Sequence, residues 1–290
     1  MDPECGALLL LKEPSSKPMD TNPPDHIMQL STTEKIKEYL ASGETDPDEF
    51  LRSYKLKSSD VKDINDATIG QSGNNSWCTF RVGMVTASSA KAVCTRYSTV
   101  QKNREMNIAT DTTSLNERLT KVMSVSSIPA IIYGKEHESD AREAYQHLLA
   151  QEHSNVHIEV PGLQVCQNLP FIGASSDGII SCSCCNSKRL LEVKCIYQHR
   201  EEAPNFAAQK RGCFFDHGVW KLNATSDYYY QIQLNLHLYD LDTCVLLIYT
   251  NKGIRPVLVK HDPKFCSEMI SHMVSYYKEC LLPYLFNFLK

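Results

Sequence analysis

The 290-residue chain contains 30 Lys and Arg, 34 Asp and Glu and 42% hydrophobic residues, which gives a formal net charge of −4. This composition is ordinary for a soluble globular protein, and the length suffices for one large domain. The longest early apolar run, Ala7 to Leu11, is too short for a secretory signal, and no later run could span a bilayer. We therefore expect an intracellular protein, cytoplasmic or nuclear and not secreted, with no membrane partner.

The first 75 residues divide into two parts. Residues 1–30 hold five prolines and too few apolar residues for a core, which predicts a disordered tail. Ser31 and Glu34 match a capping box at the start of a helix, and a second short helix is expected from Phe50 to Tyr54. With the turn-rich stretch 70–76, this pattern predicts a small helical appendage and linker over residues 31–75.

Residues 76–290 are expected to form the main domain. Apolar residues at helical spacing predict helices at 86–93, 115–122, 133–151, 227–239 and 265–289. Apolar and β-branched runs predict strands at 156–160, 163–166, 171–181, 190–196, 244–250 and 257–260. This order of elements predicts an α/β fold, with a sheet that has helices on its faces.

Three charged residues lie at the ends of two apolar strands in the centre of this domain. Glu192 and Lys194 are two positions apart, so on a strand they point to the same side, while Val193 points to the other. If the cysteine-rich turn after Ile180 closes a hairpin, Asp177 comes alongside Glu192, and the two carboxylates form an oxygen-ligand site for Mg²⁺. Beside a metal, Lys194 would be favoured in its neutral form and could orient or deprotonate a water molecule.

In a second interpretation, the Glu-x-Lys pair has no catalytic role. Such a pair often forms the solvated, charge-paired face of a strand. Here the neighbouring residues Ile179 and Leu190 are too apolar for an exposed ribbon, so the charges are expected at the rim of a core. An ionic cluster at the rim of a core favours a functional site.

Four ordered blocks extend this pattern along the chain. They are Arg81-x-Gly83-x-x-Thr86-Ala-Ser88, Gly134-Lys-Glu-His-Glu138-Ser-Asp-Ala141-Arg142-Glu-Ala-Tyr145, the Asp177 and Glu192-x-Lys194 pair, and Tyr229-Tyr230-Gln231-Ile-Gln233. Together they resemble the lambda-exonuclease, or YqaJ-type, branch of the PD-(D/E)XK nuclease superfamily over about residues 78–288. The resemblance implies a restriction-endonuclease-like core with a mixed β-sheet flanked by helices.

The resemblance also implies roles for individual residues. It assigns a catalytic role to Glu138, Asp177, Glu192, Lys194 and Gln231, and metal ligation to Asp177, Glu192 and the carbonyl of Val193. A pocket for a terminal 5′-phosphate matches Arg81, Ser88, Ser175 and Arg200. Arginine and hydroxyl groups are suited to phosphate, because they donate forked and short hydrogen bonds to its oxygens.

The implied activity is that of a Mg²⁺-dependent deoxyribonuclease, with Mn²⁺ as the alternative ion, that digests duplex DNA ends 5′ to 3′ in recombination or repair. Two alternatives stay open: a DNA-end-binding module with weak or no activity, and an endonuclease of the same superfamily. The implied partners are double-stranded DNA, a single-strand annealing protein and two further copies of the chain in a homotrimer.

The chain departs from the family pattern at several positions. Ser176 stands where the family usually has proline before the metal Asp, and Ile196 replaces a proline after the Lys-Cys pair. A further acid of the phage enzyme falls here near Gln167 and Asn168, which are uncharged. No metal ligand is lost, but one metal position is expected to be weaker or to be filled by another group.

The cysteines form a separate pattern. Twelve cysteines without a signal peptide predict reduced thiols and no structural disulfides. Cys182 and Cys185 are spaced as a zinc-binding pair, and Cys195 and His199 follow at distances that could complete a site. We do not expect zinc there, because two thiols in a hairpin turn are more often free and Cys195 should point away from the side of Lys194.

Overall fold

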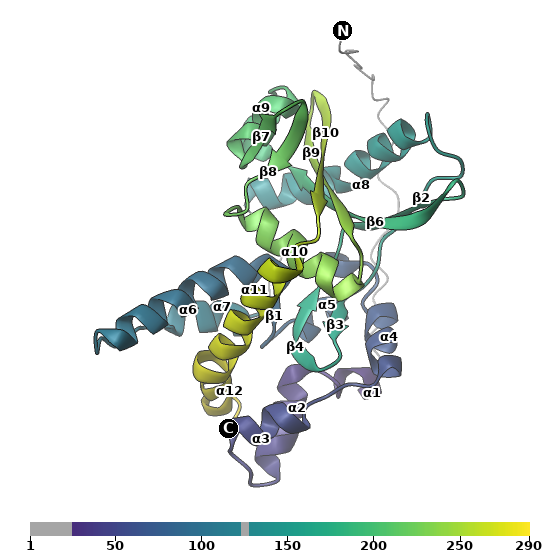
Figure 1. Ribbon diagram of the computed structural model, residues 1–290. Coiled ribbons are helices and arrows are strands. Elements are labelled where there is room, and N and C mark those ends of the chain that lie inside the picture. Colours follow the sequence, from purple (N-terminus) through teal and green to yellow (C-terminus); the bar gives the residue numbers. More distant parts are fainter. Residues whose placement is uncertain (1–24, 123–127) are drawn as a thin grey trace.

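The structure is a computed structural model that describes residues 25–122 and 128–290 (Figure 1). Its strands are β1 (Val85–Thr86), β2 (His157–Glu159), β3 (Gln164–Cys166), β4 (Leu169–Ala174), β5 (Gly178–Cys182), β6 (Cys185–Cys195), β7 (Cys213–Asp216), β8 (Val219–Leu222), β9 (Thr243–Thr250) and β10 (Gly253–Lys260). Its α-helices are α1 (Asp25–Met28), α2 (Thr32–Ala41), α3 (Pro47–Ser53), α4 (Ser58–Ala67), α5 (Asn75–Phe80), α6 (Ala90–Glu105), α7 (Thr113–Thr120), α8 (Pro129–Leu149), α9 (Pro204–Lys210), α10 (Asp227–Tyr239), α11 (Pro263–Tyr276) and α12 (Leu282–Phe288).

The main sheet is mixed, in the strand order β10-β9-β6-β5-β2. β6 and β9 pair in parallel, whereas the other neighbours in this sheet are antiparallel. A parallel pair needs a long crossover, which here contains α9, the β7-β8 hairpin and α10. The predicted α/β fold, a mixed sheet flanked by helices, is confirmed.

Helices cover both faces of the main sheet at β6. Leu191 and Val193 pack with Tyr145 of α8, whereas Leu190 packs with Ile232 and Leu236 of α10. The alternation along β6 follows from the two-residue period of a strand. β9 is buried over nearly its whole length, as expected for a strand covered on both faces. This packing places the charged residues of β6 between the sheet and α10.

The N-terminal helices share a core with the rest of the chain. Ile36 of α2, Phe50 of α3 and Ile64 of α4 belong to the same buried cluster as Phe171 of β4 and Leu282 of α12. In Figure 1, α2 and α3 lie below α12, at the end of the molecule opposite the β9-β10 hairpin. The helices α2, α3 and α4 of the segment 31–75 therefore pack into the common core.

Two elements differ from the pattern in the sequence. The predicted strand 171–181 is two strands, because the chain leaves the β1-β4-β3 sheet at Ala174 and enters the main sheet at Gly178. The predicted helix 265–289 contains a π-helical turn, Tyr277–Leu281, which ends two residues before Pro283. Proline lacks an amide hydrogen and clashes with the preceding turn, which accounts for the interruption.

The N-terminal boundary and the middle of the chain bring further differences. Most of the predicted tail, residues 1–24, lies outside the described residues, but its last part forms α1, and Ile27 is buried. α9, β7 and β8 were not predicted. Within the described parts of the chain, no helix is both long and apolar enough to cross a membrane.

Candidate active site

A cavity of about 330 Å³ opens where β5, β6, α8 and α10 meet the segment 71–88. Its lining contains most of the residues that the sequence singles out: Arg81, Ser88, Glu138, Ser175, Asp177, Glu192, Val193, Lys194 and Gln231. These residues come from five separate parts of the chain. The fold therefore brings together the acidic cluster and most of the residues assigned to a 5′-phosphate pocket.

Asp177 and Glu192 adjoin each other through the pairing of β5 with β6. Gly178 pairs with Leu191, so Asp177, one residue earlier, lies beside Glu192. The amide of Val193 donates a hydrogen bond of 2.7 Å to Asp177 Oδ2. Ser176, in the position of the family proline, is fully buried and donates to the carbonyls of Gly178 and Leu191, at 3.0 and 2.9 Å. The hydroxyl thus holds together the bend that presents Asp177.

Negative charge gathers at one end of the cavity, at Asp177, Glu192 and Glu138, while Arg81, Lys135 and Lys194 also line it. Burial, then the charges of Glu192 and Glu138, raise the pKa of Asp177 well above its usual value. Burial also raises the pKa of Glu192, although Lys194 Nζ donates to its Oε1 at 2.7 Å. Burial by itself would lower the pKa of Lys194, but the two carboxylates raise it. The cluster has more negative than positive charge, and a cation would compensate for the difference.

Two amides of α10 fix the orientation of Glu192. Gln231 Nε2 donates to Glu192 Oε1, and Asn235 Nδ2 donates to Oε2 at 2.9 Å. Gln231 and Asn235 are four residues apart, so they lie on one face of the helix. Sequence reasoning named Gln231 but missed Asn235, although the i, i+4 spacing on the same helix was a visible signal.

Glu138 lies on α8 at the edge of the cavity. It forms an ion pair with Arg142, one turn later, and Arg142 Nη1 also contacts the carbonyl of Asp177 at 3.5 Å. Arg142 thereby links α8 to the strand end that carries Asp177. Glu138 and Arg142 are four residues apart and so share one face of the helix. The structure places Glu138 close enough to Asp177 and Glu192 to affect the pKa of both.

The cavity continues into a cationic and hydroxyl-rich part. Arg81 Nη2 donates to Thr86 Oγ1 and Ser88 Oγ, both at 3.2 Å, and its guanidinium lies 3.9 Å from the ring centroid of Trp77. Trp77 Nε1 donates to Ser175 Oγ at 2.8 Å. Burial lowers the pKa of Arg81 to about 10, which leaves it charged at neutral pH. Trp77 connects the Arg81 and Ser88 pair to Ser175, a role the sequence did not indicate.

Two places in the chain that the sequence comparison with the family linked to the site do not line the cavity: Arg200, and the pair Gln167 and Asn168. The side chain of Arg200 lies 4.4 Å from the ring centroid of Tyr197 and pairs with Glu201, outside the cavity lining. Gln167, where the phage enzyme has an acid, accepts from Ser58 Oγ at 3.3 Å, and the carbonyl of Asn168 accepts from Lys55. They face the α3–α4 segment. Glu138 is the further acid that the fold brings to Asp177.

The four side chains whose spacing suggested a zinc site do not come together in the structure. Cys185 and Cys195 begin and end β6, and a strand of that length separates them by roughly 30 Å. His199 lies beyond Cys195, against Phe206. Neither Cys195 nor His199 can therefore join Cys182 and Cys185. Two other residues do, and they are described below.

The fold and the cavity define the class of the protein. A mixed sheet whose paired strands present an Asp and a Glu-x-Lys beside a helix-borne Glu is the PD-(D/E)XK arrangement. The YqaJ-like viral recombinase domain family matches residues 76–242, and the chain belongs to this family. The YqaJ-type family that the four sequence blocks predicted is thus confirmed. No functionally curated protein matches the chain.

Solved structures agree on the fold. The shutoff and exonuclease protein (SOX) from Kaposi's sarcoma-associated herpesvirus is 10% identical, with a TM-score of 0.53 over 91% of this chain and 92% of that chain. A complex of SOX with RNA gives 12% identity and a TM-score of 0.52 over 85% and 78%. The alkaline exonuclease LHK-Exo of Laribacter hongkongensis, in complex with dAMP, is 20% identical, with a TM-score of 0.50 over 72% and 93%.

Proposed function

We propose that the chain is a Mg²⁺-dependent deoxyribonuclease that removes nucleotides from the 5′ ends of duplex DNA, in recombination or repair. The observation that carries this proposal is the single cavity that holds Asp177, Glu192 and Lys194 together with Arg81 and Ser88. Chemistry at a phosphodiester and recognition of a terminal phosphate would then occur in one continuous space. Membership of the YqaJ-like family and the fold shared with exonucleases support the same activity.

The donor set fits a hard divalent cation. Asp177 and Glu192 offer carboxylate oxygens, and Val193 offers a backbone carbonyl, which are the ligand types that Mg²⁺ prefers, with Mn²⁺ as the alternative. Burial raises the pKa of both Asp177 and Glu192, and a bound cation would favour their charged forms. When bound, the ion would supply Lewis-acid activation of water and stabilisation of the leaving 3′ oxygen.

The side chains of the chain would have distinct tasks around this chemistry. Without a metal, the two carboxylates keep Lys194 positively charged. Beside a bound ion its neutral form would be favoured, and it could orient or deprotonate the attacking water. Gln231 and Asn235 keep the Glu192 carboxylate in one orientation. Glu138, in its pair with Arg142, adds a third carboxylate at the edge of the cavity.

In this proposal, Arg81, Ser88 and Ser175 hold a terminal phosphate. The guanidinium already forms hydrogen bonds to hydroxyl groups, and a phosphate dianion would accept from the same donors. Trp77, stacked on Arg81, limits the orientations that the guanidinium can take. A terminal 5′-phosphate held there would place the first phosphodiester near Asp177 and Glu192, which favours cleavage counted from a 5′ end.

The test is a cleavage assay with the full chain. A linear duplex with 5′-phosphates, the same duplex with 5′-hydroxyls, a closed circle and a matched RNA duplex are incubated with Mg²⁺ or with chelator. We expect Mg²⁺-dependent release of nucleotides from the phosphorylated linear DNA, and loss of this activity in Lys194→Ala. Binding to DNA ends without cleavage in the wild type would overturn the proposal and favour an end-binding module. Cleavage of the closed circle would indicate an endonuclease.

Two predictions about assembly depend on the family resemblance alone. A homotrimer and a single-strand annealing protein as partner would suit an enzyme that degrades one strand processively. The mass of the chain in solution, with and without duplex DNA, tests the trimer. Co-purification with a single-strand annealing protein from the same source tests the second partner.

A further inference from the structure

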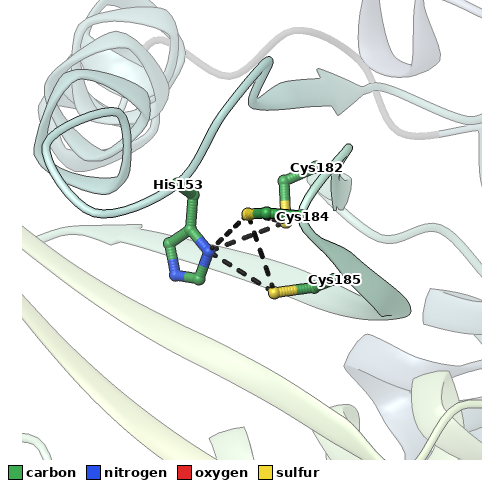
Figure 2. Close-up of side chains that lie close together, drawn as sticks. All are labelled: His153, Cys182, Cys184 and Cys185. Carbon is green, nitrogen blue, oxygen red and sulfur yellow. Dashed lines mark hydrogen bonds between the residues drawn. The ribbon is translucent and has the colours of Figure 1, made fainter.

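A cluster of three thiols and one imidazole lies away from the active site, at the turn between β5 and β6. Cys182 ends β5, Cys184 lies in the turn and Cys185 begins β6, while His153 comes from the loop between α8 and β2. Figure 2 shows the Nδ1 atom of His153 pointing at the sulfur atoms. The four ligand atoms all lie within 4.8 Å of one another. The register of β2 with β5 brings these two distant segments together.

Five of the six distances among these atoms are close to those of a tetrahedral zinc site. His153 Nδ1 lies 3.4 Å from Cys184 Sγ, 3.5 Å from Cys185 Sγ and 3.7 Å from Cys182 Sγ. Cys184 Sγ lies 3.5 Å from Cys182 Sγ and 4.0 Å from Cys185 Sγ. Tetrahedral zinc, with Zn–S bonds of about 2.3 Å and Zn–N bonds of about 2.0 Å, requires S···S near about 3.8 Å and N···S near about 3.5 Å.

The backbone around the cluster is already ordered for such a site. The amide of Ser154 donates to Cys184 Sγ at 3.4 Å, a contact of the kind that supports metal-bound thiolates. The amide and the hydroxyl of Ser183 both donate to the carbonyl of Ser154, at 2.9 and 3.0 Å. Asn155, with a left-handed φ of 51°, donates to Ser183 Oγ. The bonds made by Ser183 hold the loop and the hairpin turn against each other independently of the thiols.

We propose that His153, Cys182, Cys184 and Cys185 bind a structural zinc ion. Soft thiolates with one imidazole select zinc over the hard cations that suit the carboxylates of the active site. Four protein ligands complete the coordination and leave no open position for substrate, so this site has no catalytic role. The zinc site is distinct in place and in ligand chemistry from the Mg²⁺ site.

The place of the cluster in the fold indicates what the ion does. β5 and β6 carry Asp177 and Glu192 at their far ends, and α8, which leads to His153, carries Glu138. A zinc ion would therefore fasten the end of α8 to the hairpin that presents the two carboxylates. The tip of this hairpin extends beyond β9, which pairs with β6 only from Leu190 to Cys195. A two-stranded tip is weakly held by itself, so a cross-link at its turn would reduce its freedom.

A disulfide is the main competing use of these thiols. The sulfur separations of 3.5 and 4.0 Å are far from a bonded S–S distance of about 2.05 Å. The described cysteines are all free thiols. A disulfide between two of the three clustered thiols would leave the third thiol and His153 with no ligand to bind together. Zinc uses all four groups together.

The experiment measures zinc in the full chain, expressed with zinc and purified without chelator. We expect about one zinc per chain by elemental analysis in the wild type. Cys184→Ser and His153→Ala should lose most of it. The matched controls are Cys195→Ser and His199→Ala, the pair suggested by sequence spacing alone, and both should keep it. Equal zinc in Cys184→Ser and Cys195→Ser would overturn the assignment.

A second measurement uses the wild-type chain, so that the zinc site is tested even if the variants fail to fold. The wild-type chain is stripped of metal and titrated with Co²⁺, and we expect the intense visible bands of tetrahedral cobalt with thiolate ligands. Absence of these bands, or oxidation of Cys182, Cys184 and Cys185 in the freshly purified protein by mass spectrometry, would refute the site. Asp177→Asn should retain the zinc, so that failure of the proposed nuclease function and failure of the zinc site can be told apart.

Discussion

Asn235 Nδ2 donates a hydrogen bond of 2.9 Å to Glu192 Oε2, and both side chains are fully buried. Lys194 and Gln231 contact the other oxygen of the same carboxylate. Glu192 is thus held from both sides before any ligand arrives, which is the kind of preorganisation that a metal ligand needs. Asn235 is a positioning residue in this arrangement, since it acts through Glu192.

The first prediction tests this positioning role. In Asn235→Ala, the Glu192 carboxylate loses one of its fixed donors, and we expect the Mg²⁺ concentration for half-maximal cleavage to rise about 10- to 100-fold. KM for DNA should change little, because Asn235 does not line the cavity. Asn116→Ala is the matched control: this buried asparagine accepts from Tyr276 at 2.7 Å in another part of the core. An equal shift of the Mg²⁺ requirement in both variants would indicate a general loss of stability.

The second prediction concerns pH and the buried carboxylates. The pKa of Asp177 is higher in the folded protein than in the unfolded chain, so between these two values the folded state binds more protons. The free energy of unfolding of the metal-free protein should then fall as the pH rises from about 4 through the folded pKa. Asp177→Asn removes this charge while its amide oxygen can still accept from Val193. We expect the variant to have a higher Tm at neutral pH without metal, by about 2–4 °C for each kcal/mol gained.

The measurement is a set of thermal melts from acid to neutral pH, with chelator and with Mg²⁺. Mg²⁺ should raise the Tm of the wild type at neutral pH and leave Asp177→Asn nearly unchanged. The exposed Asp63→Asn is the control, and it should behave as the wild type in both respects. A wild-type Tm that does not respond to Mg²⁺ at neutral pH would contradict a metal site at Asp177.

The parts of the site that sequence could predict depend on local periodicity. Glu192 and Lys194 share a side of β6 because the side chains of a strand alternate, and this holds whatever the strand packs against. Glu138 and Arg142 pair because residues four apart on a helix are neighbours. Such relationships follow from secondary structure alone. The four sequence blocks of the family resemblance then predicted that these residues belong to one site.

The rest depended on tertiary packing. Asn235 is a partner of Glu192 because its face of α10 meets β6. The helix is apolar on several sides, so the pattern of apolar residues does not determine that face, and only the spacing from Gln231 indicates it. His153 reaches the thiols only through the register of β2 with β5, about thirty residues away in the chain. The spacing of Cys182 and Cys185 was visible, but their partners were not. Short elements such as β7 and β8 had too little periodicity to detect.

The third prediction separates Arg81 from Arg200 in the recognition of a 5′-phosphate. Arg81 lines the cavity with Ser88, whereas Arg200 stacks on Tyr197 and pairs with Glu201. Cleavage rates are compared on 5′-phosphorylated and 5′-hydroxyl duplexes. Arg81→Ala should lose at least about 10-fold of the preference for phosphate, since charge-assisted bonds contribute about 1.5–3 kcal/mol each. Arg200→Ala should keep the preference. The reverse result would restore the assignment of Arg200 to the pocket.

The fourth prediction concerns the hydroxyl that holds the bend before Asp177. Ser176→Ala removes the donor to the carbonyls of Gly178 and Leu191 inside the core, and we expect a loss of about 1–3 kcal/mol in the free energy of unfolding. Urea denaturation measures the loss. Ser181→Ala, on a half-buried position of β5, is the control and should cost less. A Ser176→Ala protein as stable as the wild type would show that the bend does not depend on this hydroxyl.

The last prediction tests whether the N-terminal helices are an integral part of the fold. A Cβ atom added at Gly162, just before β3, would lie 1.9 Å from the carbonyl oxygen of Asn65 at the end of α4. The same junction is held by Thr68, whose hydroxyl accepts from the amide of Leu163 at 2.7 Å. Gly162→Ala must therefore displace α4 from β3, and we expect a loss on the order of 3 kcal/mol or more in the free energy of unfolding.

The matched control for this change is Gly134→Ala. Gly134 lies inside α8, and an added Cβ would meet no atom within 4 Å, so alanine should be neutral or stabilise the helix by up to about 1 kcal/mol. Both variants are unfolded in urea and followed by circular dichroism and by tryptophan fluorescence. If α2–α4 share one cooperative core with the main sheet, Gly162→Ala shifts a single transition to lower urea in both signals. An early separate transition, with the main one unchanged, would instead indicate that residues 31–75 fold as an independent appendage, because their loss would then leave the rest of the core intact.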